Sequence, residues 1–419
     1  MEPSLIARLF LCAGAAVAGL CGAASAAEDA AAGETAAAIR RHRMGTIVIR
    51  TEPGAAVTCQ QLRHEFWFGT AINGRMFRPG RVSEEDRRRY LELFKANFNA
   101  AVHENELKWW ENERQSGEVS YAAADAMLAW CEANGIPMRG HCLLWAEDRY
   151  IRDWVKALDD DALRRRIEAR VTEVVKRYRG RIGEYDVNNE MMRKAYYAER
   201  LGEPIRAEMF RWARAADPDA VLYVNDYGAL VEGPHTEMYA RQVEALQAAG
   251  APVGGIGCQG HFSDQYIPDP KVIRQALDRL AKTGLPIRVT EFDMTTHDEQ
   301  RKARALVDVY TTCFAHPAVE GILMWGFWEG SHWRPQAALW KRDFTPTPAA
   351  EAYRDLVFNQ WWTRFEGRAD ADGRCEIPAF FGRHRVAAGG ASREVDLRKA
   401  DRTAEVDFTS PAASTPARP

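Results

Sequence analysis

The chain has 419 residues, of which 46% are hydrophobic and 27% are charged. This composition is typical of a globular protein with a large core and excludes a wholly disordered or coiled-coil protein. The formal net charge is −3, from 56 basic and 59 acidic residues, so the chain has no overall attraction to nucleic acid and we expect no nucleic-acid partner.

The first 26 residues have the pattern of an export signal. Arg8 precedes an apolar run from Leu9 to Cys21, and Ala24-Ser25-Ala26 forms a small-residue cleavage site. The apolar run is short for a membrane-spanning helix, and no later segment offers one. We therefore expect residues 1–26 to be removed as a signal peptide, leaving a secreted or periplasmic protein with no membrane association. An uncleaved anchor is the alternative.

A short N-terminal region precedes the main domain. Residues 27–43 are rich in alanine and then basic, which suits a linker. Two strand-like runs follow, Thr46–Thr51 and Val57–Leu62, and Glu52-Pro53-Gly54 between them is a turn signal. We expect residues 44–64 to form strands that flank the main domain.

Residues 65–358 alternate short apolar runs with amphipathic stretches. This alternation predicts a parallel sheet with crossover helices, and eight repeats favour a closed (β/α)8 TIM barrel of the α/β class over an open sheet. No G-x-G-x-x-G or P-loop follows a strand, which argues against a nucleotide-binding fold. The predicted strands are Phe66–Ala71, Ala100–Glu104, Met138–His141, Ile182–Asn188, Val221–Asn225, Gly255–Gln259, Ile287–Glu291 and Gly321–Trp325, and helices are expected at Glu84–Ala96, Asp160–Tyr178, Met238–Ala248 and Val272–Lys282.

The sequence after Asn359 returns to strand-like runs. Glu376–Ala387, Glu394–Leu397 and Ala404–Phe408 are the predicted strands. About fifty residues are too few for a sturdy core of their own. We therefore expect residues 359–408 to form a small β module together with the N-terminal flanking strands, followed by a disordered tail at 409–419.

Polar residues gather at the ends of the predicted barrel strands, where the loops of such a barrel converge and where its chemistry takes place. One polar strand end means little, but seven on one face indicate a functional site. The segments are His103 to Lys108, His141 with Trp145, Asn188-Asn189-Glu190, Asn225-Asp226-Tyr227, Gln259-Gly260-His261, Glu291-Phe292-Asp293, and Trp325 with Glu329 and Trp333.

Glu190 and Glu291 end two different strands, so both carboxyl groups should enter one pocket from different walls. Paired carboxylates suit glycoside hydrolysis, in which one donates a proton to the leaving oxygen and the other acts as an anion. Mutual repulsion splits their pKa values in the direction that this chemistry needs. The alternative is a structural ion pair of either glutamate with Arg288 or Arg193.

Other side chains near this pair have several possible uses. Asp293 and His261 should hydrogen-bond, which would orient the imidazole toward Glu291. Trp145, Trp325 and Trp333 are candidates for a wall on which sugar rings stack. A metal held by His103, His141 and His261 is the remaining alternative, although no His-x-His or H-E-x-x-H spacing supports it.

From about Phe66 to Leu356 the chain resembles the family 10 glycoside hydrolases, the (β/α)8 endo-β-1,4-xylanase family. The order, the spacing and the strand placement of its motifs all match. The motifs are Glu104-Asn105-Glu106-Leu107-Lys108-Trp109, Arg139-Gly140-His141 through Trp145, Tyr185-Asp186-Val187-Asn188-Asn189-Glu190, Asn225-Asp226-Tyr227, Gln259-Gly260-His261, Val289-Thr290-Glu291-Phe292-Asp293, and Trp325-Gly326 through Trp333-Arg334.

The resemblance implies a retaining double displacement on a β-1,4-linked polysaccharide, by a monomer that needs no metal or cofactor. Glu190 would be the acid/base and Glu291 the nucleophile, with carboxyl groups about 5–5.5 Å apart. Asn189 would bind the sugar 2-hydroxyl. Gln259 and His261 would orient Glu291, and Asp293 would lie behind His261. Glu104, Asn105 and Lys108 would bind the next sugar outward. The residues that would line the site are His141, Trp145, Tyr227, Trp325 and Trp333.

The chain departs from the family pattern at four places, one of which is Phe327-Trp328-Glu329-Gly330 near the eighth strand. Ala146 and Asp148 stand where the family usually has His and Gln, and Gly228 stands where it usually has Asn. The chain therefore resembles a divergent, plant-type branch. Two alternatives follow from these changes: the same chemistry on another β-1,4-glycan, or a carbohydrate-binding barrel with little turnover.

Overall fold

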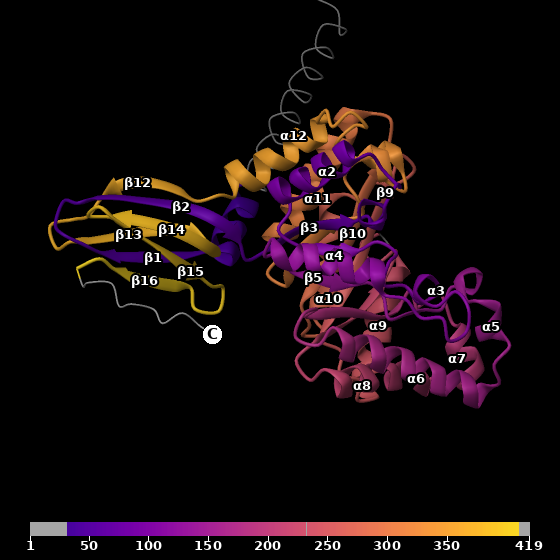
Figure 1. Cartoon of the computed structure of the whole chain (residues 1–419). Coiled ribbons are helices and arrows are strands. Elements are labelled where there is room, and N and C mark those ends of the chain that lie inside the picture. Colours follow the sequence, from indigo (N-terminus) through magenta and orange to yellow (C-terminus); the bar gives the residue numbers. More distant parts are fainter. Residues whose placement is uncertain (1–31, 232, 410–419) are drawn as a thin grey trace, which may run out of the picture.

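A computed structural model defines residues 32–231 and 233–409. The chain folds into a barrel and a smaller β module beside it (Figure 1). The signal peptide predicted for residues 1–26 lies outside the described residues, as does the predicted tail apart from Thr409.

The barrel is one parallel sheet, and it confirms the predicted fold class. Its order is β5-β4-β3-β11-β10-β9-β8-β7-β6, and an additional pairing of β5 with β7 closes the ring. The third predicted strand is interrupted, because β5 and the short β6 both pair with β7. The strands are β3 (Trp67–Ile72), β4 (Ala101–His103), β5 (Met138–Gly140), β6 (Leu144–Trp145), β7 (Glu184–Asn189), β8 (Val221–Asp226), β9 (Gly255–Ser263), β10 (Ile287–Thr295) and β11 (Val319–Met324).

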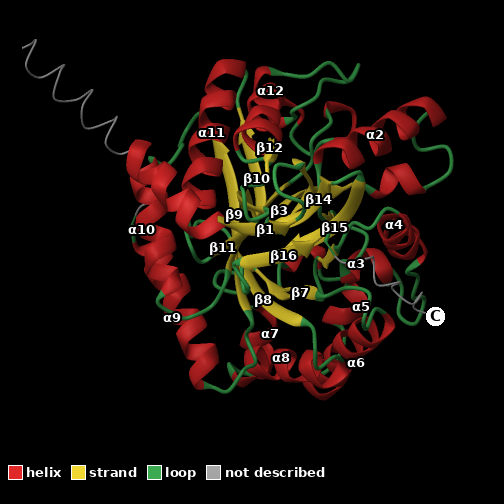
Figure 2. Ribbon diagram, turned by 90° about the vertical axis from the view of Figure 1, so that its left-hand side faces the viewer, coloured by secondary structure: helices red, strands yellow, loops and turns green. Residues whose placement is uncertain are grey.

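Helices surround the barrel (Figure 2) and bury their apolar faces against it. In α6, for example, Leu163, Ile167 and Val171 are fully buried at helical spacing. None of the described helices is long and apolar enough to cross a membrane. The helices are α2 (Glu84–Asn97), α3 (Trp109–Asn112), α4 (Ala122–Ala133), α5 (Asp153–Lys156), α6 (Asp160–Arg177), α7 (Tyr196–Leu201), α8 (Pro204–Ala216), α9 (Pro234–Ala248), α10 (Pro270–Ala281), α11 (Glu299–Ala315) and α12 (Pro348–Asp355).

The β module combines both ends of the chain, as predicted. One sheet has the order β13-β1-β16 and the other has the order β12-β2-β14-β15, with a shared apolar core between them. The predicted strand Glu376–Ala387 is two strands in different sheets, because the chain turns at Phe381, and β12 was not predicted. The strands are β1 (Met44–Arg50), β2 (Ala56–His64), β12 (Arg364–Arg368), β13 (Arg374–Phe380), β14 (Gly382–Ala388), β15 (Ala391–Leu397) and β16 (Thr403–Asp407).

The linker expected at residues 27–43 is wrong for its described part, because residues 32–43 form a helix. Ile39 and Arg43 of this helix are buried. The Arg43 guanidinium donates to the backbone carbonyls of Phe314 in the last turn of α11, of His316 and of Val319 at the start of β11, at 2.6 to 2.8 Å. A cation is favourable at the end of α11, where the last carbonyls of a helix have no partner within the helix. The helix thereby ties the β module to the barrel.

Candidate active site

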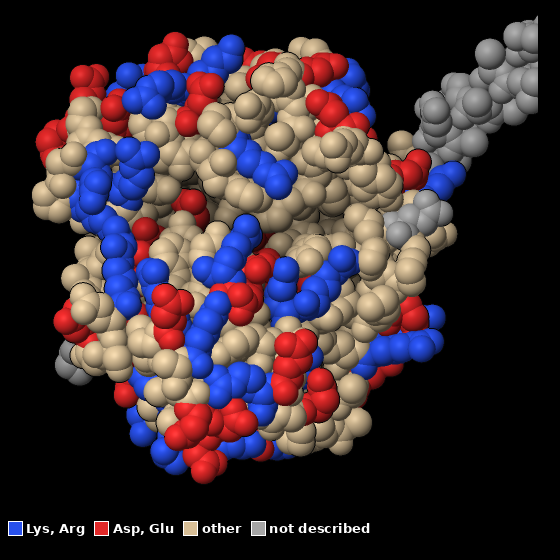
Figure 3. Space-filling view, turned by 90° about the vertical axis from the view of Figure 1, so that its right-hand side faces the viewer, with Lys and Arg blue, Asp and Glu red and all other residues tan. Residues whose placement is uncertain are grey.

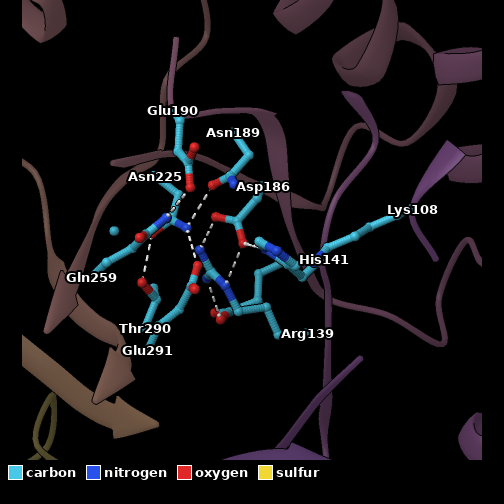
Figure 4. A network of polar contacts seen from close by, with 12 residues as sticks. Lys108, Arg139, His141, Asp186, Asn189, Glu190, Asn225, Gln259, Thr290 and Glu291 are labelled. Atoms are coloured by element: carbon cyan, nitrogen blue, oxygen red, sulfur yellow. Dashed lines mark hydrogen bonds and ion pairs between the residues drawn. The ribbon is translucent and has the colours of Figure 1, made fainter. Parts of the chain in front are cut away.

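The polar strand ends predicted from the sequence meet at one end of the barrel. Figure 3 shows the face on which α3, α5 and α7 lie, and a hollow in it with acidic and basic side chains around its margin. Figure 4 shows Glu190 and Glu291 in one network of polar side chains together with Asn225 and Gln259. Glu190 directly follows β7 and Glu291 lies on β10, so the two glutamates meet from different strands, as the sequence predicts.

Glu291 lies on β10 and is 5% exposed. Its Oε1 accepts a hydrogen bond from Asn225 at 2.8 Å, and its Oε2 lies 3.2 Å from His261 Nε2. The pairing of β10 with β9 shifts register between Val289 and Glu291. Such a bulge lets neighbouring side chains reach the same side of a strand, and Thr290 does so by donating to Asn225 Oδ1 at 2.5 Å. Asn225 is thus fixed from both sides.

His261 and Asp293 form a buried pair behind Glu291. His261 lies opposite Asp293 in the register of β9 and β10, and its Nδ1 is 2.9 Å from Asp293 Oδ2. Trp333 Nε1 donates to the same oxygen at 2.8 Å. Burial disfavours the imidazolium, but Asp293 and then Glu291 outweigh burial and raise the pKa of His261 to about 10. The predicted orientation of His261 by Asp293 is therefore present.

The charge on His261 acts on Glu291 in turn. Burial alone would raise the pKa of the Glu291 carboxyl group, but the hydrogen bond from His261 and the electrostatic effects of His141, His261 and Lys108 outweigh it. The pKa of Glu291 is therefore lowered. Glu291 is held as an anion in a buried place, which is the state that a nucleophile requires.

Asp293→Asn is expected to reduce the dependence of stability on alkaline pH. The pKa of His261 is higher in the folded than in the unfolded protein, so protonation of His261 stabilises the fold. This stabilisation is complete at pH values below the unfolded pKa of about 6.5 and is lost as the pH rises through the folded pKa of about 10. The wild-type unfolding free energy should fall across this window by up to about 1.4 kcal/mol per pH unit from this group. Asp293→Asn removes the largest favourable cause and should flatten the slope, as measured by urea unfolding at several pH values. Equal slopes would contradict the assignment.

Glu190 directly follows β7 and has a left-handed backbone with φ 58°. Such a conformation costs a non-glycine residue on the order of 1 kcal/mol. The Glu190 N–H donates to the Asn225 carbonyl at 2.8 Å, which fixes the turn. The carboxylate accepts from Trp145 Nε1 at 3.0 Å and from Gln259 Nε2 at 3.1 Å. Both donors are neutral, in contrast to the charged partner of Glu291.

One expectation about these glutamates needs correction, and one alternative is not supported. Gln259, expected to orient Glu291, donates to Glu190, because the side chain crosses the pocket from β9 (Figure 4). The ion pair with Arg288 or Arg193, the structural alternative, does not form among the described residues. Arg288 pairs with Glu184 at 2.9 Å, and the Arg193 guanidinium lies 4.6 Å from the centre of the Tyr227 ring.

A buried ionic layer lies below the carboxylates and was not predicted. Arg139 is fully buried and binds Asp186 and Glu184. Asp186 also lies 2.9 Å from His141 Nδ1 and so orients that ring. Burial opposes ionisation of Asp186, but Arg139 and His141 outweigh burial and lower its pKa. Arg139 and Asp186 both occur in the motifs that carry the family resemblance, but the sequence gave no indication that they pair.

A second group of polar residues follows β4, as predicted. Lys108 Nζ donates to Asn105 Oδ1 at 3.0 Å, and Asn105 Nδ2 lies 3.5 Å from Glu104 Oε1. Asn73, which the sequence did not single out, donates to Glu104 Oε2 at 2.5 Å. Burial and the neighbouring Glu106 raise the pKa of Glu104 to about 7. These groups form one cluster of hydrogen-bonding side chains beside the carboxylates.

The predicted aromatic residues occupy different places around the pocket. Trp325 is buried, edge-on to His141 at 5.0 Å between ring centres. Trp333 is 45% exposed, and the Arg334 guanidinium lies 4.2 Å from the centre of its ring. Trp145 has one face covered by the Tyr150 ring, at 4.6 Å between ring centres. The structure therefore places Trp333 as the most accessible stacking surface of the three tryptophans.

Three of the departures from the family pattern lie in different surroundings. Ala146 is buried next to Trp145. Asp148 pairs with Lys156 at 3.0 Å, and its side chain is 73% exposed. Gly228 has φ 75°, a conformation that asparagine also adopts readily, so the backbone is compatible with either residue and only the side-chain amide is lost.

The histidine-metal alternative finds no support in geometry. Among residues 32–231 and 233–409, no group of three or more His, Cys, Asp or Glu side chains is arranged to hold a metal ion. His141 and His261 instead face Asp186 and Asp293. The arrangement offers two carboxylates in unlike environments, one anionic beside a cation and one held by neutral donors.

Residues 59–356 match glycosyl hydrolase family 10. Endo-1,4-beta-xylanase 1 of Arabidopsis thaliana is 36% identical over 337 residues, which cover 80% of this chain and 34% of that protein. Anti-sigma-I factor RsgI6 of Acetivibrio thermocellus is 37% identical over 324 residues, which cover 77% of this chain and 41% of that protein. The chain thus spans less than half the length of these curated relatives.

Solved structures show the same barrel. Native xylanase 10B from Thermotoga maritima superposes with a TM-score of 0.65 at 26% identity, and the match covers 71% of this chain and 96% of that chain. Xylanase 10B from Thermotoga petrophila RKU-1, solved in complex with xylobiose, also has a TM-score of 0.65, at 25% identity, over 71% of this chain and 95% of that chain.

Proposed function

The chain belongs to glycosyl hydrolase family 10, and we propose that it is a retaining endo-β-1,4-xylanase that cleaves internal bonds of xylan. The observation that carries the proposal is the unlike surroundings of two carboxylates in one pocket. Glu291 lies 3.2 Å from His261 Nε2, and Asp293 and Glu291 raise the pKa of His261 to about 10. In the part of the chain that the structure describes, the Glu190 carboxyl group accepts hydrogen bonds from Trp145 and Gln259, which are neutral donors. A retaining glycosidase needs this asymmetry, because one carboxylate attacks while the other carries a proton.

In the first step, a Glu291 oxygen forms a bond to the anomeric carbon. The bond from that carbon to the glycosidic oxygen breaks, and this oxygen takes the proton from Glu190. The products are a glycosyl ester on Glu291 and a free leaving sugar. As the charge of Glu291 passes into the ester, Asn225 continues to hold its Oε1 in place.

In the second step, Glu190 is ionised and takes a proton from water. The water oxygen attacks the anomeric carbon and the ester bond to Glu291 breaks, so both carboxyl groups return to their starting states. Two inversions leave the configuration of the anomeric carbon unchanged. The chemistry needs only these two groups and water, so no cofactor is proposed.

The remaining residues have proposed roles in holding the polysaccharide. Asn189 Oδ1 accepts a hydrogen bond from Asn225 at 2.9 Å, which leaves the Asn189 amide nitrogen to bind the sugar 2-hydroxyl. Glu104, Asn105 and Lys108 present a ready set of donors and acceptors for the next sugar. The exposed ring of Trp333 offers a stacking surface.

The choice of xylan rests on the relatives, several of which are named as xylanases, and on the xylobiose complex of one of them. Another β-1,4-glycan is the second candidate, because Ala146 and Gly228 lack side chains that the family pattern has near the cleaved bond. Export through the leader at residues 1–26 and a monomeric state stay predictions from the sequence.

The proposal is tested by the products from a panel of polysaccharides, with the anomer of the first product followed by proton NMR. We expect xylo-oligosaccharides from xylan that first appear as the β-anomer and then equilibrate. An α-anomer as first product would contradict the retaining mechanism. Faster release of reducing ends from a glucan than from xylan would reassign the substrate, and binding without release would show a carbohydrate-binding protein.

A further inference from the structure

The orientation of Glu190 depends on Trp145. Its indole Nε1 donates to Glu190 Oε2 at 3.0 Å, so a rotation of the indole would withdraw one of the two neutral donors that hold the carboxyl group. The next residue, Ala146, ends in a methyl group and can supply no hydrogen bond to fix this segment. The backbone of this segment pairs with β7, and the orientation of the indole is set by its other side-chain contacts.

Those contacts are Lys108, whose Nζ lies 5.0 Å from the centre of the Trp145 ring, and a column of three rings. The Tyr150 ring stacks on Trp145 with ring centres 4.6 Å apart and planes 26° apart. The Trp110 ring stacks in turn against Tyr150, with ring centres 5.5 Å apart and planes 21° apart. Near-parallel rings at these separations attract one another beyond the area they bury. The column runs from Trp145 to α3, which carries Trp110.

Polar contacts join the loop that carries Tyr150 both to α3 and to the turn after β7. Arg152 donates from Nε and from its terminal nitrogen to the Trp110 carbonyl, at 3.2 and 2.8 Å. At the other end, Glu147 pairs with Lys194 at 2.7 Å, and the Lys194 N–H donates to the Glu190 carbonyl at 2.9 Å. The loop that carries Tyr150 is thus joined to the turn that carries Glu190, so a displacement of one is transmitted to the other.

We propose that Tyr150 is a positioning residue that, through its stack on Trp145, holds the carboxyl group of Glu190 in line for proton donation. This inference rests on the proposed function, because it assigns Glu190 the role of acid. Tyr150 does not touch the reacting atoms. Its ring, rather than its hydroxyl group, is the part that acts.

This role predicts a loss that depends on the leaving group. Protonation by Glu190 matters for a basic leaving group such as a sugar alkoxide, but a dinitrophenolate leaves without it. If Tyr150 aligns Glu190, removing its ring should slow only substrates that need the proton. A stacking surface for the leaving sugar would instead act on affinity, and a purely structural residue would slow every substrate equally.

The experiment measures kcat/KM on aryl β-xylobiosides of similar size, whose phenols have pKa values from about 4 to about 10. For Tyr150→Leu, which fills space but cannot stack, we expect wild-type rates on the dinitrophenyl substrate and about a tenfold loss on the phenyl substrate. Tyr150→Phe keeps the ring and should recover most of the wild-type rate. Circular dichroism and thermal unfolding confirm that each variant is folded.

Other results would overturn the inference. An equal loss on all substrates would show a structural role, and an unchanged dependence on leaving-group pKa with a raised KM on xylan would show a sugar-binding role. Full activity of Tyr150→Leu on the phenyl substrate would also contradict it. A wild-type protein that hydrolyses none of the substrates would contradict the proposed function itself, a result distinct from those obtained with the variants.

Discussion

Glu291→Gln is expected to lower kcat on xylan by at least about 10⁴-fold, because the variant keeps the shape of the side chain but cannot form the glycosyl ester. Glu291 is buried, and Asn225 and His261 hold both of its oxygens. A neutral amide also removes one of the charges that raise the pKa of His261. The measurement is the release of reducing ends from xylan, with circular dichroism to show that the variant is folded.

Glu320→Gln is the matched control for this variant. Glu320 lies on β11, the strand next to β10, but near its amino end and thus at the opposite end of the barrel. Its side chain is 44% exposed. Loss of a carboxylate there should leave kcat within about twofold of wild type, since exposed substitutions rarely change more than local stability. Retention of activity by Glu291→Gln would reject Glu291 as the nucleophile.

Glu190→Ala is expected to separate substrates by their leaving groups. Loss of the general acid should slow hydrolysis of xylan by about 10²–10⁴-fold. A dinitrophenyl β-xylobioside should still form the glycosyl ester at close to the wild-type rate, because its leaving group needs no proton. The ester should then accumulate, since the same residue activates water in the second step. The measurement is a burst of dinitrophenol followed by a slow steady state.

Azide gives this prediction an internal control. Azide attacks the anomeric carbon without a general base, so it should raise the steady-state rate of Glu190→Ala and yield a β-xylobiosyl azide. The same addition should not revive Glu291→Gln, in which no ester forms. An equal loss on xylan and on the dinitrophenyl substrate, with no response to azide, would reject Glu190 as the acid/base.

The sequence predicted the site well where the chemistry follows from strand ends. The carboxyl ends of parallel strands meet at one end of a barrel, so the sequence alone predicts that Glu190, Glu291, His261 and Asp293 lie close together. The side of a strand on which a side chain lies follows from its position in the alternating pattern of the strand, and this pattern can be read from the sequence.

The partners across the pocket were harder to predict. Gln259 lies opposite Glu291 in the register of β9 and β10, yet its side chain extends to Glu190. Asn225 stood in a quoted motif, but its bonds to Glu291 and Thr290 depend on a register shift in β10. Such a shift is set by the closing of the whole barrel and has no signal in a single strand.

By itself, then, the sequence determined the alternation of strands and helices, the barrel, and the residues at the carboxyl ends of its strands. It could do so because the spacing of apolar residues and the direction of a strand are local properties. Tertiary structure alone decided how Arg139 and Asp186 pair beneath the pocket, how Trp110 and Tyr150 stack behind Trp145, and that residues 32–43 are a helix. These contacts join segments far apart in the chain. Their free energy comes from burial and charge pairing that exist only after the barrel has closed.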